Sequence, residues 1–223
     1  MMNFLFCGYR DWSLSVVSYL EKIFSEDNFF VAKSRKQFNE YSKSNIEFNL
    51  VLFVGWSWLI DERFLLKNKC VCVHPSPLPK YRGGSPIQHQ IIEGEKTSKV
   101  TAFLMTAGLD AGPILAESDE FGLDGELLDV LRRISICALD CLREVVKCEK
   151  EGNLEGTPQK EEEATFFKRR KKCQSEIAID DFKIYTARAI YDKIRALQDP
   201  YPNAYVVCGD GNKLYFTVAK IDD

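Results

Sequence analysis

Two side chains in this sequence, His74 and Asp110, have the types and surroundings that acid–base chemistry needs. His74 follows an apolar run and opens a loop rich in proline and glycine (residues 75–86), and Asp110 lies in a second loop (residues 106–112) between glycines. An imidazole titrates near neutral pH and can therefore move protons, and a nearby carboxylate can orient it. A histidine and an aspartate on loops also fit surface or turn roles, so the pair alone does not define a site.

Apolar runs and amphipathic patterns predict the elements that position these loops. Runs typical of buried strands lie at residues 3–7, 28–32, 49–54, 70–73, 99–105 and 113–121. Helical spacing follows Asp11, which we expect to cap that helix, and recurs at residues 61–67, 86–93 and 125–149. Residues 34–47 are polar and fit no element clearly. This alternation predicts an α/β fold over residues 1–150, a Rossmann-like three-layer domain with a mostly parallel sheet.

Ligands of such sheets bind at the carboxyl ends of the strands. Three loops should meet there: residues 55–58, the loop that starts at His74, and residues 106–112. The predicted domain therefore brings His74 and Asp110 to the same edge of the sheet.

The composition changes after residue 150. Residues 151–180 are polar and typical of a linker. Residues 181–223 predict a small C-terminal subdomain with a helix (residues 186–198) and a β-hairpin, because the sequence Gly-Asp-Gly-Asn favours a tight turn at residues 209–212. The linker contains a basic run, residues 168–172. We favour a solvated segment as its interpretation, with nucleic-acid contact as the alternative.

Charge and hydropathy exclude several classes of protein. The chain has 223 residues, of which 45% are hydrophobic and 28% charged, as in ordinary globular proteins. Its formal net charge of -3 argues against a nucleic-acid partner. The longest apolar stretch is about half the length that a membrane span needs. The N-terminus lacks the features of a signal peptide, so we expect a cytoplasmic protein without a membrane partner.

The eight cysteines predict neither a disulfide framework nor a metal site. Thiols in the cytoplasm stay reduced. Cys70 and Cys72 are too close in sequence for a usual pair of zinc ligands, and the chain has only two histidines. We therefore expect no bound metal.

The loop that begins at His74, taken as a whole, resembles a loop found in a known protein family. Residues 74–88 (HPSPLPKYRGGSPIQ) look like the signature loop of the folate-dependent formyltransferases. Residues 100–115 resemble the aspartate loop of the same family, and the spacing between His74 and Asp110 matches. A third block, residues 194–204, resembles the segment that follows the catalytic domain in sugar N-formyltransferases. The resemblance spans most of the chain.

This resemblance implies transfer of a formyl group from N10-formyltetrahydrofolate to a primary amine. His74 then matches the general base, and Asp110 matches the aspartate that positions it and helps to move protons. Cys72 stands where the family has a catalytic asparagine, and a thiol is a weaker hydrogen-bond donor than an amide. Three explanations are open: another donor serves instead, the rate is low, or activity has been lost. Cys72 as a covalent nucleophile is a further interpretation.

The same resemblance implies a folate site between two loops, in which backbone groups make most of the contacts with the pterin. The residues at the matching positions are Gly55, Trp56, Ser57, Trp58, Ala107, Gly108, Leu109 and Asp110. Trp56 and Trp58 fit the role of core aromatic residues equally well.

The first loop of the chain, residues 8–12 (GYRDW), indicates which amine the protein could formylate. An aromatic residue and a cation there suit a nucleotide-linked amino sugar. The predicted substrate-binding residues are Tyr9, Arg10, Trp12, Lys80, Tyr81 and Arg82. The start of the chain resembles the small, pseudaminic-pathway type of sugar formyltransferase. The residues after the linker are too few for the tRNA-binding domain of a methionyl-tRNA formyltransferase.

Two other functions stay open at this point. One is formylation of methionyl-tRNA or of another amine, and the other is a folate- or nucleotide-binding pseudoenzyme, because of Cys72. The exposed edge of the predicted hairpin is compatible with a homodimer.

Overall fold

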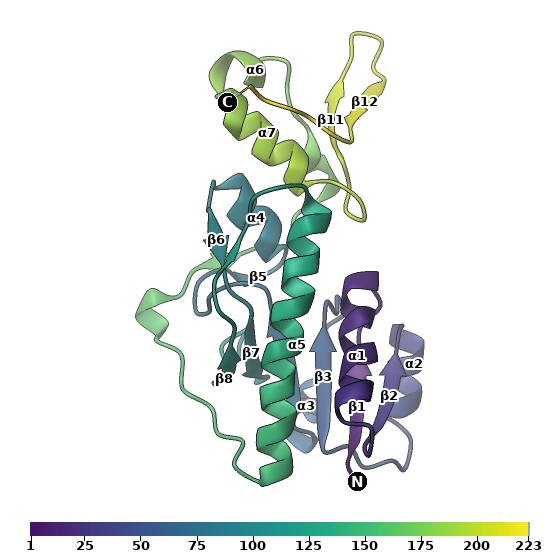
Figure 1. The fold of residues 1–223 in the computed structure, drawn as a ribbon. Coiled ribbons are helices and arrows are strands. Elements are labelled where there is room, and N and C mark those ends of the chain that lie inside the picture. Colours follow the sequence, from purple (N-terminus) through teal and green to yellow (C-terminus); the bar gives the residue numbers. More distant parts are fainter. Residues whose placement is uncertain (223) are drawn as a thin grey trace.

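The computed structural model describes residues 1–222, and it confirms the predicted α/β fold (Figure 1). Its six-stranded sheet has the order β2-β1-β3-β4-β7-β8. The strands are β1 (Asn3–Cys7), β2 (Asn28–Ala32), β3 (Leu50–Val54), β4 (Cys70–His74), β7 (Thr101–Leu104) and β8 (Ile114–Glu117). The first four run parallel to one another, and β7 and β8 are antiparallel to their neighbours.

Helices cover both faces of the parallel half, which explains why its strands are apolar throughout. Alternate strand residues point into two separate clusters of buried side chains. One cluster packs against α1 (Asp11–Ile23) and the long helix α5 (Leu127–Glu151). The other packs against α2 (Arg35–Tyr41) and α3 (Glu62–Lys67). Three layers result, as predicted.

Two local predictions were wrong or incomplete. Asp11 is the first residue of α1 rather than its cap, and the residue before it, Arg10, occupies the cap position. The apolar run at residues 113–121 is not one strand, because it divides into β8 and β9 (Phe121–Gly122). The second of these pairs with β6 (Thr97–Ser98) outside the main sheet.

The unassigned residues 34–47 contain α2. Its N-cap is Ser34, whose hydroxyl accepts a hydrogen bond from the backbone N–H of Gln37 at 3.2 Å. Its one buried side chain is Phe38. A single buried residue leaves no periodic pattern, so the sequence carried little signal for this helix.

The C-terminal region contains the helix and hairpin that its sequence predicts. It comprises α6 (Asp181–Ile184), α7 (Ala187–Ala196), β11 (Ala204–Val207) and β12 (Lys213–Phe216), around a small apolar cluster of its own. In Figure 1, α7 lies beside α4 (Pro86–Ile92). Arg195 of α7 forms a buried ion pair with Asp192 and donates to the carbonyl of Leu123, which joins this region to the main domain.

The polar segment that follows α5 folds back along the main domain (Figure 1). Thr157 forms a β-bridge with Ile114, and β10 (Phe166–Phe167) pairs in parallel with β5 (Arg82–Gly83). Two short 3-10 helices, η1 (Glu161–Glu163) and η2 (Lys172–Ser175), lie before and after β10. We call residues 157–171 the strap. It is therefore a fixed part of the main domain rather than a simple connection.

Within residues 1–222, no helix combines the length and the apolar character that crossing a membrane requires.

Candidate active site

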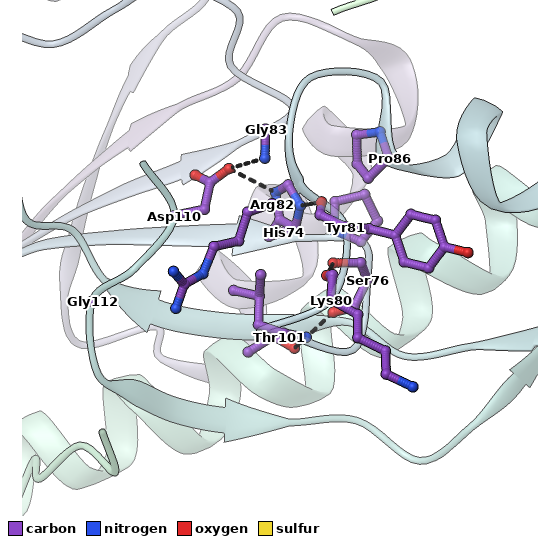
Figure 2. A network of polar contacts seen from close by, with 12 residues as sticks. His74, Ser76, Lys80, Tyr81, Arg82, Gly83, Pro86, Thr101, Asp110 and Gly112 are labelled. Carbon is purple, nitrogen blue, oxygen red and sulfur yellow. Dashed lines mark hydrogen bonds and ion pairs between the residues drawn. The ribbon is translucent and has the colours of Figure 1, made fainter. Parts of the chain in front are cut away.

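His74 is the last residue of β4, and its side chain is buried. One ring nitrogen, Nε2, lies 2.8 Å from the backbone carbonyl oxygen of Tyr81. A carbonyl oxygen only accepts, so Nε2 carries a proton and donates it. The other nitrogen, Nδ1, faces the Oδ2 of Asp110 at 3.8 Å (Figure 2). In the neutral ring, Nδ1 is therefore the nitrogen with the free lone pair.

Asp110 is held in place by both its side chain and its backbone. Its Oδ2 accepts a hydrogen bond of 2.7 Å from the backbone N–H of Gly83 (Figure 2). Its backbone adopts a left-handed conformation with φ of 48°, which aspartate tolerates better than most residues. The side-chain amide of Gln159, in the strap, donates to the carbonyl oxygens of Asp110 at 2.9 Å and Gly112 at 2.8 Å. Three separate segments thus fix the carboxylate against the imidazole.

This geometry allows proton transfer at Nδ1 of His74. The neutral imidazole can accept a proton there, and the resulting cation faces the Asp110 carboxylate. Because the Nδ1 to Oδ2 distance of 3.8 Å exceeds a hydrogen bond, a small movement of either side chain would complete the contact on protonation. The pair is therefore arranged as a general base with a positioning carboxylate.

Cys72 lies two residues before His74 on β4, and it borders a cavity that His74 and Asp110 also line. Burial raises the pKa of its thiol well above the usual value, and the negative charge of Asp110 raises the pKa further. The side chain is therefore a neutral thiol at physiological pH. A neutral thiol is a poor nucleophile, which argues against covalent catalysis by Cys72.

A large cavity opens where the strand ends meet, with a volume of about 1190 Å³. Pockets for one small ligand are typically about 300–1,000 Å³, so this cavity exceeds the usual size for a single ligand. The predicted site residues that line it are Tyr9, Arg10, Trp12, Gly55, Trp56, Ser57, Trp58, Cys72, His74, Ala107, Gly108, Leu109 and Asp110. The three loops expected at this edge of the sheet therefore come together.

Aromatic side chains form one side of the cavity. The ring of Trp58 lies 4.9 Å from that of Tyr9 and 4.6 Å from that of Trp56. The Tyr9 hydroxyl and the Ser57 Oγ are hydrogen-bonded at 2.6 Å. Trp56 also packs on the buried ring of Phe53, so it belongs to the core and to the cavity wall at once.

Lys80, Tyr81 and Arg82 do not line the cavity, contrary to our expectation that they bind substrate. The Arg82 side chain is 1% exposed, and it donates to Gln159 and forms an ion pair with Glu161 at 2.7 Å. The Tyr81 hydroxyl, which has one proton to donate, lies 2.9 Å from a carboxylate oxygen of Glu93 and 2.9 Å from one of Glu95, and its ring stacks on Phe167. Lys80 is exposed. Tyr81 and Arg82 hold the strap in position instead.

The contribution of the strap to this site was not predicted. Most of the basic run is exposed, as a solvated segment would be, but Arg170 is half-buried, and Lys168, Arg169, Arg170 and Lys171 border the cavity. Gln159 reaches the backbone of the aspartate loop. A glutamine in a polar segment gives no signal of such a role. The basic run was recognisable, but no pattern around it indicated where the segment lies in the fold.

In residues 1–222, no cluster of three or more histidine, cysteine, aspartate or glutamate side chains is arranged to hold a metal ion. All eight cysteines lie in this part of the chain, and each is an unpaired thiol.

Comparison with known proteins agrees with this geometry. The formyl transferase family model matches residues 18–120, which include His74 and Asp110, so this part of the chain belongs to that family. A methionyl-tRNA formyltransferase from Staphylococcus aureus is 33% identical over 180 residues, which is 76% of this chain and 54% of the relative. The chain thus spans about half the length of the curated relatives that it matches.

Solved structures share the fold over the whole chain. A methionyl-tRNA formyltransferase from Clostridium thermocellum is 28% identical with a TM-score of 0.85, and the match covers 100% of this chain and 94% of that one. A sugar N-formyltransferase from a Shewanella species is 20% identical with a TM-score of 0.76, and the match covers 100% of both chains. At that identity the second match shows the fold alone.

Proposed function

We propose that this protein transfers a formyl group from N10-formyltetrahydrofolate to the amine of a nucleotide-activated amino sugar. The observation that carries this proposal is the His74–Asp110 pair inside a cavity larger than the usual pocket for a single ligand. Membership of residues 18–120 in the formyl transferase family supports the reaction type.

The residues of the cavity fit a folate. The indole Nε1 of Trp56, a residue that lines the cavity, is buried and has no hydrogen-bond acceptor within residues 1–222. The loops at residues 55–58 and 106–110 border the same space. We assign the folate to these two loops. When bound, it supplies an activated formyl group.

The chain's own residues then perform the proton transfers. His74 removes the proton of the attacking amine at Nδ1, because Nε2 is already committed to the carbonyl of Tyr81. The imidazolium formed in this way stabilises the negative charge that develops on the acyl oxygen, and it gives its proton to the leaving N10 nitrogen as the bond between that nitrogen and the formyl carbon breaks. Asp110 holds the ring in position and balances its charge. Cys72 contributes a weak donor in place of the family's amide.

The acceptor assignment rests on Tyr9 and Arg10, which also line the cavity. The ring of Tyr9 suits a nucleotide base, and the guanidinium of Arg10 suits a phosphate. A second candidate acceptor is the amine of methionyl-tRNA, because the relatives with 33% and 28% identity carry that name. A third interpretation, a folate-binding pseudoenzyme, rests on Cys72. These three assignments differ in what they predict for one assay.

The test is a formyl-transfer assay with N10-formyltetrahydrofolate and a panel of UDP- and dTDP-linked amino sugars, with methionyl-tRNA in parallel. Mass spectrometry detects the formamide product. We expect turnover with at least one sugar and none with the tRNA. Turnover with methionyl-tRNA alone would overturn the sugar assignment. Folate binding without turnover of any amine would favour the pseudoenzyme.

A further inference from the structure

The basic part of the strap is fixed over the loop that follows His74. The backbone N–H of Gly84 donates to the carbonyl of Phe167 at 3.0 Å, and that of Arg82 donates to Thr165 at 2.9 Å. The two glycines of this loop have no room for a side chain. A Cβ on Gly83 would lie 2.1 Å from the Phe167 oxygen, and one on Gly84 would lie 2.5 Å from the Cα of Arg169. The glycines therefore allow the basic run to cross at van der Waals distance.

The charges that line the cavity are mostly positive. Its cations are Arg10, Lys168, Arg169, Arg170 and Lys171, and its carboxylates are Glu62 and Asp110. The chain as a whole has a formal net charge of -3. A locally positive cavity in an acidic protein raises the local concentration of anions.

Arg170 differs from the other cations of the cavity in having a fully buried nitrogen without a hydrogen-bond acceptor in residues 1–222. That nitrogen is Nε, and the side chain as a whole is half-buried. One terminal nitrogen donates to the carbonyl of Gln174 at 2.6 Å. None of the ion pairs within residues 1–222 includes Arg170. Burial lowers the pKa of its guanidinium. Burial is also the main cause of the lowered pKa of Lys193, and the charge of Arg170 lowers that pKa further. A bound anion would oppose both pKa shifts.

Arg170 and Arg10 are connected to the same loop (residues 199–202). The Arg10 guanidinium lies 4.5 Å from the ring centre of Tyr201 and donates to the carbonyl of Pro200. On the strap side, Arg170 binds Gln174, and the next residue, Ser175, donates to the carbonyl of Pro202. Arg10 and Arg170, from distant parts of the chain, thus line the same cavity, and each is linked to the loop of residues 199–202.

We propose that Arg170 is a phosphate anchor that, together with Arg10, binds the diphosphate of a nucleotide-linked substrate. This proposal rests on the function proposed above and assigns part of its acceptor site to the strap. A guanidinium matches phosphate oxygens through paired hydrogen bonds, which lysine cannot reproduce. The folate also carries carboxylates, so the experiment has to separate the two anions.

The experiment measures binding by isothermal titration calorimetry with UDP, dTDP and 5-formyltetrahydrofolate as separate probes. The variants are Arg170→Ala and Arg170→Lys, and the matched control is Lys172→Ala, because Lys172 belongs to the same basic run but does not line the cavity. We expect Arg170→Ala to weaken binding of the nucleoside diphosphate by about 10- to 100-fold. Arg170→Lys should be intermediate. Folate binding in all variants, and diphosphate binding in Lys172→Ala, should change by less than about twofold.

Three results would overturn the assignment of Arg170. The first is unchanged diphosphate binding in Arg170→Ala, while the wild-type protein binds it. The second is weakened folate binding in the same variant, which would assign the strap to the glutamate tail of the folate. The third is an equal loss in Arg170→Ala and Lys172→Ala with tighter binding of RNA than of UDP, which would indicate a nucleic-acid surface. A wild-type protein that binds folate but no nucleoside diphosphate would instead overturn the proposed substrate class itself.

Discussion

Two parts of the chain form the candidate site in different ways. The strand-end loops supply His74, Asp110 and the aromatic side chains, and their positions follow from a buried parallel sheet. The strap supplies Gln159 and the basic run, and backbone pairing with a two-residue strand fixes its position. The first part could be inferred from sequence patterns, whereas the second became visible only in the folded chain. Chemistry thus belongs to the first part, and we assign positioning and anion binding to the second.

The largest effect is expected when the base in the strand-end loops, His74, is removed. His74→Ala leaves the amine without a proton acceptor, and we expect kcat to fall by about 10²- to 10⁴-fold. Formyl transfer is measured with the amino sugar that the panel assay identifies. Added imidazole should restore part of the rate, and the melting temperature shows whether the fold is intact. Undiminished turnover in a folded variant would mean that His74 is not the base.

A variant that displaces the strap tests its contribution to activity separately from that of the strand-end loops. In Gly84→Ala the new Cβ would lie 2.5 Å from the Cα and 2.7 Å from the N of Arg169, so the strap must move. We expect a loss of about 1–3 kcal/mol in the free energy of unfolding. The displaced strap should lower kcat/KM by about 100-fold. Urea denaturation and steady-state kinetics measure the two effects.

The matched control for this variant is Gly94→Ala. Gly94 has φ of 83°, and a Cβ there would meet nothing within 4 Å. It should lose about 1 kcal/mol of stability through its backbone conformation alone and keep its activity. If both variants lost activity equally, the position of the strap would not matter for catalysis.

A third variant, Gln159→Glu, removes the hydrogen bonds from the strap to the aspartate loop but retains an acceptor for Arg82. A carboxylate cannot donate to the carbonyls of Asp110 and Gly112. We therefore expect kcat to fall about tenfold at nearly unchanged KM for the amine, with stability retained. The exposed Glu162→Gln serves as control. A loss of stability in place of the effect on kcat would give Gln159 a purely structural role.

The smallest effect is expected at Cys72. Because the pKa of this thiol is raised, its thiolate fraction at pH 8 is far below that of an ordinary cysteine. Iodoacetamide at that pH should modify the exposed Cys173 and Cys208 and leave Cys72 unreacted, as peptide mass spectrometry can show. Cys72→Ala should change kcat by less than about threefold, because a neutral thiol is a weak donor. Loss of all activity in Cys72→Ala would contradict this and revive the covalent mechanism.

The strand-end loops could be predicted and the strap could not, because only the strands before those loops have a recognisable sequence pattern. The buried strands β1, β3 and β4 have apolar sequences without alternation, and their order along the chain with helices between them implies the sheet. His74 ends one of these strands, and Asp110 lies in the loop between β7 and β8. The positions of the motif loops were therefore predictable.

The strap could not be predicted in the same way. Phe166 and Phe167 pair with Arg82 and Gly83 through backbone atoms, and a two-residue strand has no periodicity to detect. The substrate-binding assignment of Arg82 was wrong for a related reason. An arginine in a motif loop suggests an exposed cation. The strap supplies Gln159 and Glu161, whose contacts compensate the cost of burying the Arg82 charge.

The pairing of β5 with β10 also has a consequence for the order in which the site forms during synthesis. Tyr81 and Thr165, which are hydrogen-bonded, are 84 residues apart in sequence. A nascent chain that has emerged only as far as α5 already contains His74, Asp110 and every strand of the main sheet, but it has no strap. Contacts across such long separations form late and slowly. Ribosome-bound chains should therefore acquire a folded sheet well before they can hold an anion beside the base.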